Sequence, residues 1–168
     1  MSCGVASHTA PEFSSANVGY STAAGTELEL KGRNAAGFRW QASYALAATS
    51  DHTVLNTGGM PTGIVEYAHS APEHVIIGGI GYSRGKWETD LLGRWQSSYQ
   101  DYRLNADRSA LLPVTIDNYV TLDARVGYRL TETVLVSLSA QQFNQSTLVE
   151  TAGPPVERRV IVSLTVRL

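Results

Sequence analysis

The last stretch of the chain, from Pro155 to Leu168, alternates between apolar and polar residues almost to its end. One face carries Val156, Val160, Val162, Leu164, Val166 and Leu168, interrupted by Arg158. The other face carries Glu157, Arg159, Ser163, Thr165 and Arg167, with Ile161 as its single apolar residue. Side chains repeat every two residues in a β-strand, so the pattern predicts one strand with an apolar and a charged face. Its length suits a transmembrane β-strand, which needs about 9–11 residues.

The same period predicts further strands upstream of this one. They begin near Gly25, Phe38, His74, Trp87, Val120 and Val134, and the fourth of them is predicted to run to Tyr102. Residues 1–24 are small and polar without a period, and they are interpreted as an irregular tail or loop. No helical period appears between the strands. The sequence therefore predicts an all-β fold, an antiparallel up-and-down meander of about seven strands.

The connections between these strands alternate in length. Tight turns are predicted at Asn34, Ser83 and Thr131, whereas long loops begin at Asp51 and Arg103 and an intermediate one near Ser146. Outer-membrane barrels have this asymmetry, with short periplasmic turns and longer extracellular loops. Aromatic residues also gather near strand ends, as the girdles of such barrels do: Phe38, Trp40, Tyr82, Trp87 and Tyr128 by the short turns, and Tyr99, Tyr102, Tyr119 and Phe143 by the long connections.

Composition narrows the functional classes. The 168 residues include 13 basic and 15 acidic side chains, scattered along the chain, so no basic face for nucleic acid is predicted. No run approaches the roughly 18 apolar residues of a membrane helix. Cys3 is the single cysteine, which excludes an internal disulfide. Residues 1–15 lack the basic and apolar regions of a secretory signal.

Several sequence patterns resemble nucleotide-binding, metal-binding or catalytic motifs, but none of them meets the requirements of such a motif. The glycines between Val75 and Gly85 precede a predicted strand rather than a helix, so they do not make a nucleotide-binding turn. The four histidines, His8, His52, His69 and His74, lack the short paired spacing of a metal site. No Gly-x-Ser-x-Gly sequence marks a nucleophile. We expect neither an enzyme nor a cofactor.

Four segments resemble those of one family of membrane proteins. They are Asn17–Leu30, Ala71–His74, Asn118–Arg125 and Ser139–Asn144, the last departing from the common residues at Gln141, Gln142 and Asn144. Together they are similar to the C-terminal part of TonB-dependent outer-membrane receptors, plugged barrels that import siderophores, cobalamin or sugars. The resemblance covers roughly residues 16–168 and implies that residues 25–168 are a C-terminal barrel segment located in the bacterial outer membrane. It implies that the plug and the earlier strands of the 22-stranded barrel are absent from this chain.

The resemblance also implies partners and candidate site residues. The partners would be outer-membrane lipid, the missing plug and barrel strands, and the TonB system. Ligand contacts are expected in the extracellular loops, at His52, Tyr67, His69, Tyr102, Arg103, Asp107 and Arg108. Side chains expected to face the barrel lumen are Glu88, Asp90, Arg94, Asp123, Arg125 and Arg159. They are most simply interpreted as a hydrated, ion-paired wall.

Two other classes of β-barrel protein remain possible from the sequence alone. A small independent outer-membrane barrel of about eight strands could act as a porin or an adhesin. A soluble barrel of the lipocalin type is the second alternative, and it would place the apolar face inward and the charged face outward. The direction in which the apolar face points therefore separates the membrane interpretation from the soluble one.

Overall fold

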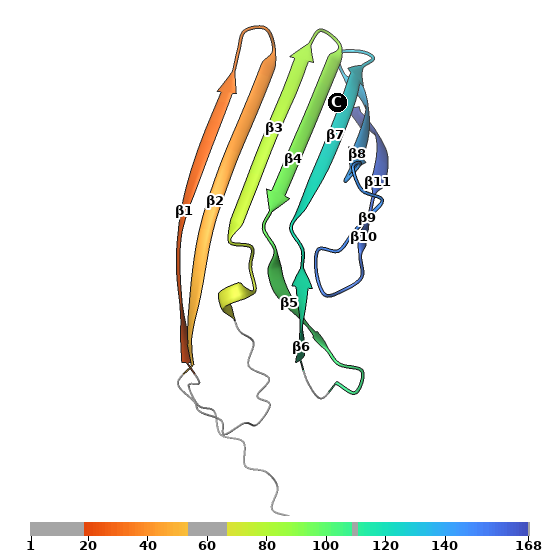
Figure 1. The fold of residues 1–168 in the computed structure, drawn as a ribbon. Coiled ribbons are helices and arrows are strands. Elements are labelled where there is room, and N and C mark those ends of the chain that lie inside the picture. The colour runs from red at the N-terminus through yellow and green to blue at the C-terminus, as the bar shows by residue number, and fades with distance from the viewer. Residues whose placement is uncertain (1–18, 54–66, 109–110, 168) are drawn as a thin grey trace, which may run out of the picture.

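The computed structural model describes residues 19–53, 67–108 and 111–167. Seven strands form one antiparallel, curved sheet in the order β1-β2-β3-β4-β7-β8-β11 (Figure 1). They are β1 (Gly19–Arg33), β2 (Phe38–Thr53), β3 (His74–Arg84), β4 (Trp87–Gln96), β7 (Tyr119–Arg129), β8 (Val134–Gln141) and β11 (Arg159–Val166). The predicted all-β meander is confirmed.

The remaining elements lie in the longer connections. They are the 3-10 turn η1 (Tyr67–His69), a hairpin of β5 (Tyr99–Leu104) and β6 (Leu111–Ile116), and a short pair of β9 (Thr147–Leu148) and β10 (Val156–Glu157). In the described ranges, no helix has the length and apolar character needed to cross a membrane.

Short turns and long connections lie at opposite ends of the sheet (Figure 1). In the first short turn the Asn34 side chain accepts hydrogen bonds from the backbone N–H groups of Ala36 and Phe38, both at 3.1 Å. Gly37 has a φ of 94°, which favours glycine. In the third, Thr131 Oγ1 accepts from the backbone N–H of Val134 at 3.0 Å. Local turn chemistry therefore fixes this end of the sheet.

The first two strands are longer than the sequence predicts. β1 begins at Gly19 rather than Gly25, and β2 continues to Thr53, past the predicted loop start at Asp51. The ladder of β1 and β2 is unbroken from Arg33 opposite Arg39 to Gly19 opposite Thr53. Small residues here carry no apolar and polar alternation, so backbone hydrogen bonds rather than a side-chain pattern define this extension.

The predicted strand from Trp87 to Tyr102 is wrong, because β4 ends at Gln96 and β5 begins at Tyr99. Ser97 at the break accepts the His74 N–H on its side chain at 3.1 Å and donates its own N–H to the His74 carbonyl at 2.9 Å. Most of the loop predicted after Arg103 is instead the second half of the β5–β6 hairpin, which pairs Tyr99 with Ile116 and Leu104 with Leu111.

The last predicted strand is also divided. The Arg158 N–H donates to the Ser146 carbonyl at 3.0 Å, which separates β10 from β11. Val156–Glu157 pairs with β9, and only Arg159–Val166 pairs with β8. The break coincides with the charged residue that interrupts the apolar face in the sequence.

Buried apolar side chains of the described residues lie at the long-connection end. They are Ile116, Tyr119 and Leu148, with Tyr99 and Val114 packed against them. These residues join the β5–β6 hairpin, the start of β7 and the connection from β8 to β11. The seven-stranded sheet itself has one apolar face that no other described element covers.

Candidate functional site

The strand register places one kind of side chain on each face of the sheet. Neighbours across the sheet include Trp40 with Ile80, Ile80 with Leu91, and Leu138 with Val162, all on one face that we call the outer face. The opposite, inner face carries Arg39, Asp90 and Arg125 in one row across the strands, with Gly81 between Arg39 and Asp90. The two-residue periods of the separate strands are therefore in phase.

Over the middle strands β4 and β7, the inner face is less exposed than the outer face, which is the reverse of the arrangement expected in water. On the outer face, Val162 is 73% exposed, Leu30 65% and Ile80 61%. On the inner face, the side chain of Glu88 is only 21% exposed and that of Arg125 33%. Water favours charged side chains at the more exposed positions and apolar side chains at the buried ones. The outer face therefore suits an apolar solvent such as lipid.

Aromatic pairs cross neighbouring strands on the outer face near the short turns. The ring centroids of Phe38 and Tyr82 lie 4.6 Å apart, and those of Trp87 and Tyr128 lie 4.8 Å apart. Nearby, the indole of Trp40 occupies the space that a side chain on Gly32 would need. Amphipathic rings of this kind suit the boundary between hydrocarbon and headgroups.

A chain of ion pairs runs across the inner face from β2 to β7. Arg39 pairs with Asp90, and the second oxygen of Asp90 lies 3.4 Å from Arg125 Nη1. The same nitrogen lies 3.5 Å from Glu88 Oε2, and Glu88 Oε1 accepts a hydrogen bond from Arg129 Nη2 at 2.6 Å. Cations and carboxylates alternate along this row, so each carboxylate has an arginine on either side.

Glycine makes the first of these pairs possible. Arg39 and Asp90 belong to β2 and β4, and Gly81 of β3 lies between them in the register. A Cβ on Gly81 would lie 2.5 Å from Arg39 Nε and 2.7 Å from Asp90 Oδ1. The missing side chain lets the guanidinium cross one whole strand. Arg39 is not among the residues that the sequence predicts to face the lumen, because neither this register nor the role of Gly81 can be read from a two-residue period.

All six residues predicted to face the lumen lie on the inner face, although they divide into two groups. Glu88, Asp90 and Arg125 belong to the ion-pair row. Arg94, Asp123 and Arg159 instead line a cavity of about 290 Å³ nearer the long connections. The cavity also includes Glu150 and Glu157, which come from the connection between β8 and β11.

That connection is tied to β7 by a side-chain amide. Asn144 Oδ1 accepts the Leu122 N–H at 2.9 Å, and Asn144 Nδ2 donates to the Val120 carbonyl at 2.8 Å. The pairing of β7 with β8 begins at Ala124, so Asn144 takes the place of a strand neighbour for the start of β7. Gln142 has a φ of 54° and donates its N–H to Asp123 Oδ1 at 2.7 Å. Both residues depart from the family's common residues, and their roles were missed.

The candidate ligand residues of the loops do not come together. His52 lies in β2 on the outer face, with its ring stacked on Tyr20 at a centroid distance of 4.8 Å, and so lies on the face opposite the ion-pair row. Tyr102 and Arg103 lie in β5, and Asp107 and Arg108 lie in the turn of the hairpin, where Arg108 has a φ of 59°. These four residues belong to a hairpin rather than to an open loop.

His69 lies beside a second cavity at this end. The cavity has a volume of about 280 Å³ and is lined by Thr49, His69, Glu73, Tyr99 and several alanines. Tyr67 begins the turn that carries His69, but its side chain lies outside the described part of the chain. Burial, followed by the charges of Asp101 and Glu150, raises the pKa of Tyr99 above its ordinary value, and its hydroxyl donates to the Glu150 carbonyl.

The described residues hold no group of three or more His, Cys, Asp or Glu side chains suited to a metal ion. What the inner face offers is instead a polar, ion-paired wall with two cavities toward the long connections. Comparison with known proteins shows the family of the chain. The model of the TonB dependent receptor-like β-barrel family matches residues 2–144. The chain belongs to this family. The family is one of receptors, which confirms the expectation that the protein is not an enzyme.

Solved structures of the family share the fold. FpvA of Pseudomonas aeruginosa PAO1, bound to pyoverdine, has 19% sequence identity and a TM-score of 0.66, and the match covers 88% of this chain and 22% of that one. The FrpB iron transporter of Neisseria meningitidis has 15% identity and a TM-score of 0.65, with 87% and 24% covered. The chain thus spans about a quarter or less of the length of these receptors. No curated protein matches it.

Proposed function

We propose that this chain forms a section of barrel wall in a TonB-dependent receptor of the bacterial outer membrane and serves the uptake of an iron–siderophore complex. The family membership supports the receptor class. The siderophore is our choice among the siderophore, cobalamin and sugar ligands of the family, because the solved structures with this fold include a pyoverdine receptor and an iron transporter.

The observation that carries the proposal is the reversed exposure of the two faces. Apolar side chains of all seven strands share one exposed face, while the ion pairs of Glu88 lie on the opposite face, where Glu88 is only 21% exposed. A soluble barrel of the lipocalin type requires the opposite arrangement. A lipid-facing wall around a wet lumen requires the observed one.

In this account the long connections face the outside of the cell. The cavity lined by Arg94, Asp123 and Arg159 and the hairpin residues Tyr102, Arg103, Asp107 and Arg108 would contact the ligand or its path. His69 would contribute from the second cavity. The lipid, the plug with the remaining barrel strands, and the energy-supplying TonB system are the partners that the proposal requires.

Uptake of radioactive iron by whole cells tests the proposal. Cells with and without an intact gene for this protein would be starved of iron and supplied with iron loaded on a panel of siderophores. We expect one siderophore to deliver iron only when both this gene and TonB are present. Equal iron uptake with and without the gene across the panel, together with a gene-dependent uptake of cobalamin or a sugar, would refute the siderophore assignment.

A further inference from the structure

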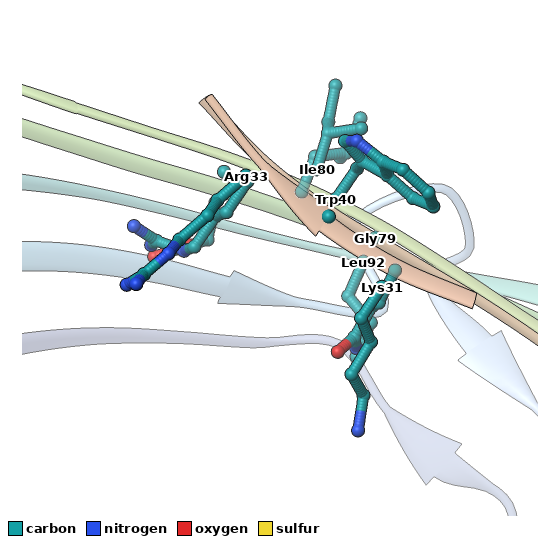
Figure 2. A pocket seen from close by; sticks show the side chains of 12 residues that line it. Lys31, Arg33, Trp40, Gly79, Ile80 and Leu92 are labelled. Atoms are coloured by element: carbon teal, nitrogen blue, oxygen red, sulfur yellow. The ribbon is translucent and has the colours of Figure 1, made fainter. Parts of the chain in front are cut away.

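The inner face has a third hollow, at the short-turn end of the sheet. Its volume is about 610 Å³, and residues of β1, β2, β3 and β4 line it. Gly79 and Gly81 lie in its floor, Arg39 and Asp90 reach over Gly81, and Lys31 and Arg33 lie beside it. In Figure 2, Lys31 and Arg33 extend from one side of the sheet and Trp40 and Ile80 from the other. Charged side chains therefore line the hollow from the inner face, while Trp40 and Ile80 border it from the outer face.

The charges around this hollow are unequal. Three cationic side chains share it with one carboxylate, Asp90, which is already engaged by Arg39 and by Arg125. Lys31 Nζ lies 2.6 Å from Glu29 Oε1 of its own strand. Arg33 forms no ion pair with any residue that the structure describes. An anion placed beside Arg33 would therefore meet a cation that the sheet has left unpaired.

The register strengthens this imbalance. Arg33 lies directly opposite Arg39 in the pairing of β1 with β2. Like charges at directly opposed positions destabilise a strand pair, unless another charge offsets them. Arg39 reaches away across Gly81 to Asp90, but no acidic residue of β2 is within the same reach of Arg33. A counter-charge for Arg33 would therefore approach from the other side of β1 or from the lumen.

A polypeptide is the partner that the position of Arg33 favours. Within the described residues β1 pairs only with β2, so its other edge presents backbone N–H and C=O groups over Gly19–Arg33. In a membrane such groups need hydrogen-bond partners, which another strand supplies. A segment alongside β1 would place its inward side chains next to Arg33, about 5 Å away between Cβ atoms.

We propose that the hollow receives an Asp or Glu side chain from a polypeptide segment outside residues 19–167 that lies beside β1, and that its carboxylate pairs with Arg33. The inference rests on the proposed function, because it requires this sheet to be part of a larger barrel wall. Beyond that function, the inference names the chemical group, a carboxylate, that the neighbouring segment places beside Arg33 at the edge of β1. The pair would join a guanidinium and a carboxylate, which are suited to two parallel hydrogen bonds.

Zero-length cross-linking in outer membranes of cells that produce the protein tests this pair. A carbodiimide joins an amine to a carboxylate in direct contact, and the chain has only two lysines, Lys31 and Lys86. Arg33→Lys places an amine at the hollow, and Arg108→Lys, in the exposed hairpin turn, is the matched control. Peptide mass spectrometry should find residue 33 of the first variant joined to an Asp or Glu outside residues 19–167. Residue 108 of the control should give no such product.

Charge reversal provides a second readout. Arg33→Glu should reduce the folded, heat-modifiable protein in the outer membrane by about fivefold or more, whereas Arg33→Lys and Arg108→Glu should leave its amount unchanged. Loss of folded wild-type protein from the membrane fraction would instead contradict the proposed function. With the wild type folded, residue 33 joined to Asp90 or Glu88 of the sheet would overturn the pair. An amine at 33 that is protected from acetylation without any cross-link would indicate a small anion or a lipid phosphate, and would overturn it as well.

Discussion

At the scale of single residues, the contribution of an ion pair to the stability of the inner face depends on how exposed its charged side chains are. Glu88 holds two arginines and is only 21% exposed, whereas Lys31 of the Lys31–Glu29 pair is 62% exposed. Exposed pairs contribute about 0–1 kcal/mol, because water screens them. Hydrogen bonds to a less exposed charge contribute more, about 1.5–3 kcal/mol before any screening is counted.

Glu88→Gln should therefore destabilise the folded barrel by about 1–2 kcal/mol, since Arg125 and Arg129 lose their shared carboxylate. Lys31→Gln is the matched control, and its effect should be too small to measure. Urea titrations of barrels reconstituted in lipid vesicles would give both values. Equal effects of the two substitutions would show that the ion-pair row adds nothing to the wall.

Asn144 has a role that a residue-level measurement can isolate. Asn144→Ala removes the acceptor for the Leu122 N–H, and a lost hydrogen bond of about 1 kcal/mol corresponds to roughly fivefold faster amide exchange. Gln145→Ala is the control, because the Gln145 side chain donates to the Val120 carbonyl, whereas the Leu122 N–H is accepted by Asn144. Hydrogen exchange at Leu122 should accelerate in the first variant and not in the second. Unchanged exchange in both would mean that Asn144 does not pair with β7.

That these charged residues share one face of the sheet could be predicted from the sequence, but their partners could not. A period of two assigns Glu88, Asp90 and Arg125 to one face of their strands whatever the register. The link from Arg39 to Asp90 depends on Gly81 lying between them, which is a property of three aligned strands. Asn144 was visible as a departure from the family's common residues, yet nothing in the sequence showed that its amide would replace a strand neighbour.

At the scale of elements, strands with strong alternation were predicted and those without it were not. β7 and β8 correspond closely to the predicted strands near Val120 and Val134. β5 was merged with β4, because the aromatic and polar residues continue in step through Ser97 and Ser98 while the backbone turns away to pair with β6. The first residues of β1 were missed, since Ser, Thr and Ala carry no facial pattern.

The contact between the β5–β6 hairpin and the β8–β11 connection should depend on pH. Tyr99 donates to the Glu150 carbonyl, and its pKa in the folded protein is raised above 10.0. The unfolded chain therefore releases this proton first, so the stabilisation is complete below about pH 10 and is lost as pH rises through the folded-state pKa. Urea midpoints measured from pH 8 to pH 11 should fall more steeply for the wild type than for Tyr99→Phe. Parallel curves would exclude a contribution from this hydroxyl.

At the scale of the whole molecule, the two ends of the sheet should lie on opposite sides of the membrane. An epitope inserted between Asp107 and Arg108, in the β5–β6 hairpin, should be labelled by antibody on intact cells. The same epitope between Arg84 and Gly85, in a short turn, should be labelled only after the outer membrane is opened. Both sites are exposed turns, so insertion should be tolerated equally. Labelling of intact cells at Arg84 alone would invert the orientation.

The central claim is that the outer face meets lipid, and substitutions of Val162 test it most directly. Val162 is 73% exposed and lies opposite Leu138 on that face. In lipid, Val162→Arg should lower the free energy of unfolding by about 2–4 kcal/mol, while Val162→Phe should be neutral or stabilising. Ser163→Arg, one position along the strand and on the inner face, should be much milder. A packed soluble interior would make Val162→Phe costly by about 1–3 kcal/mol as well. Urea titration of the three variants in lipid vesicles would contradict the account if Val162→Phe destabilised the protein strongly or if Val162→Arg had no effect.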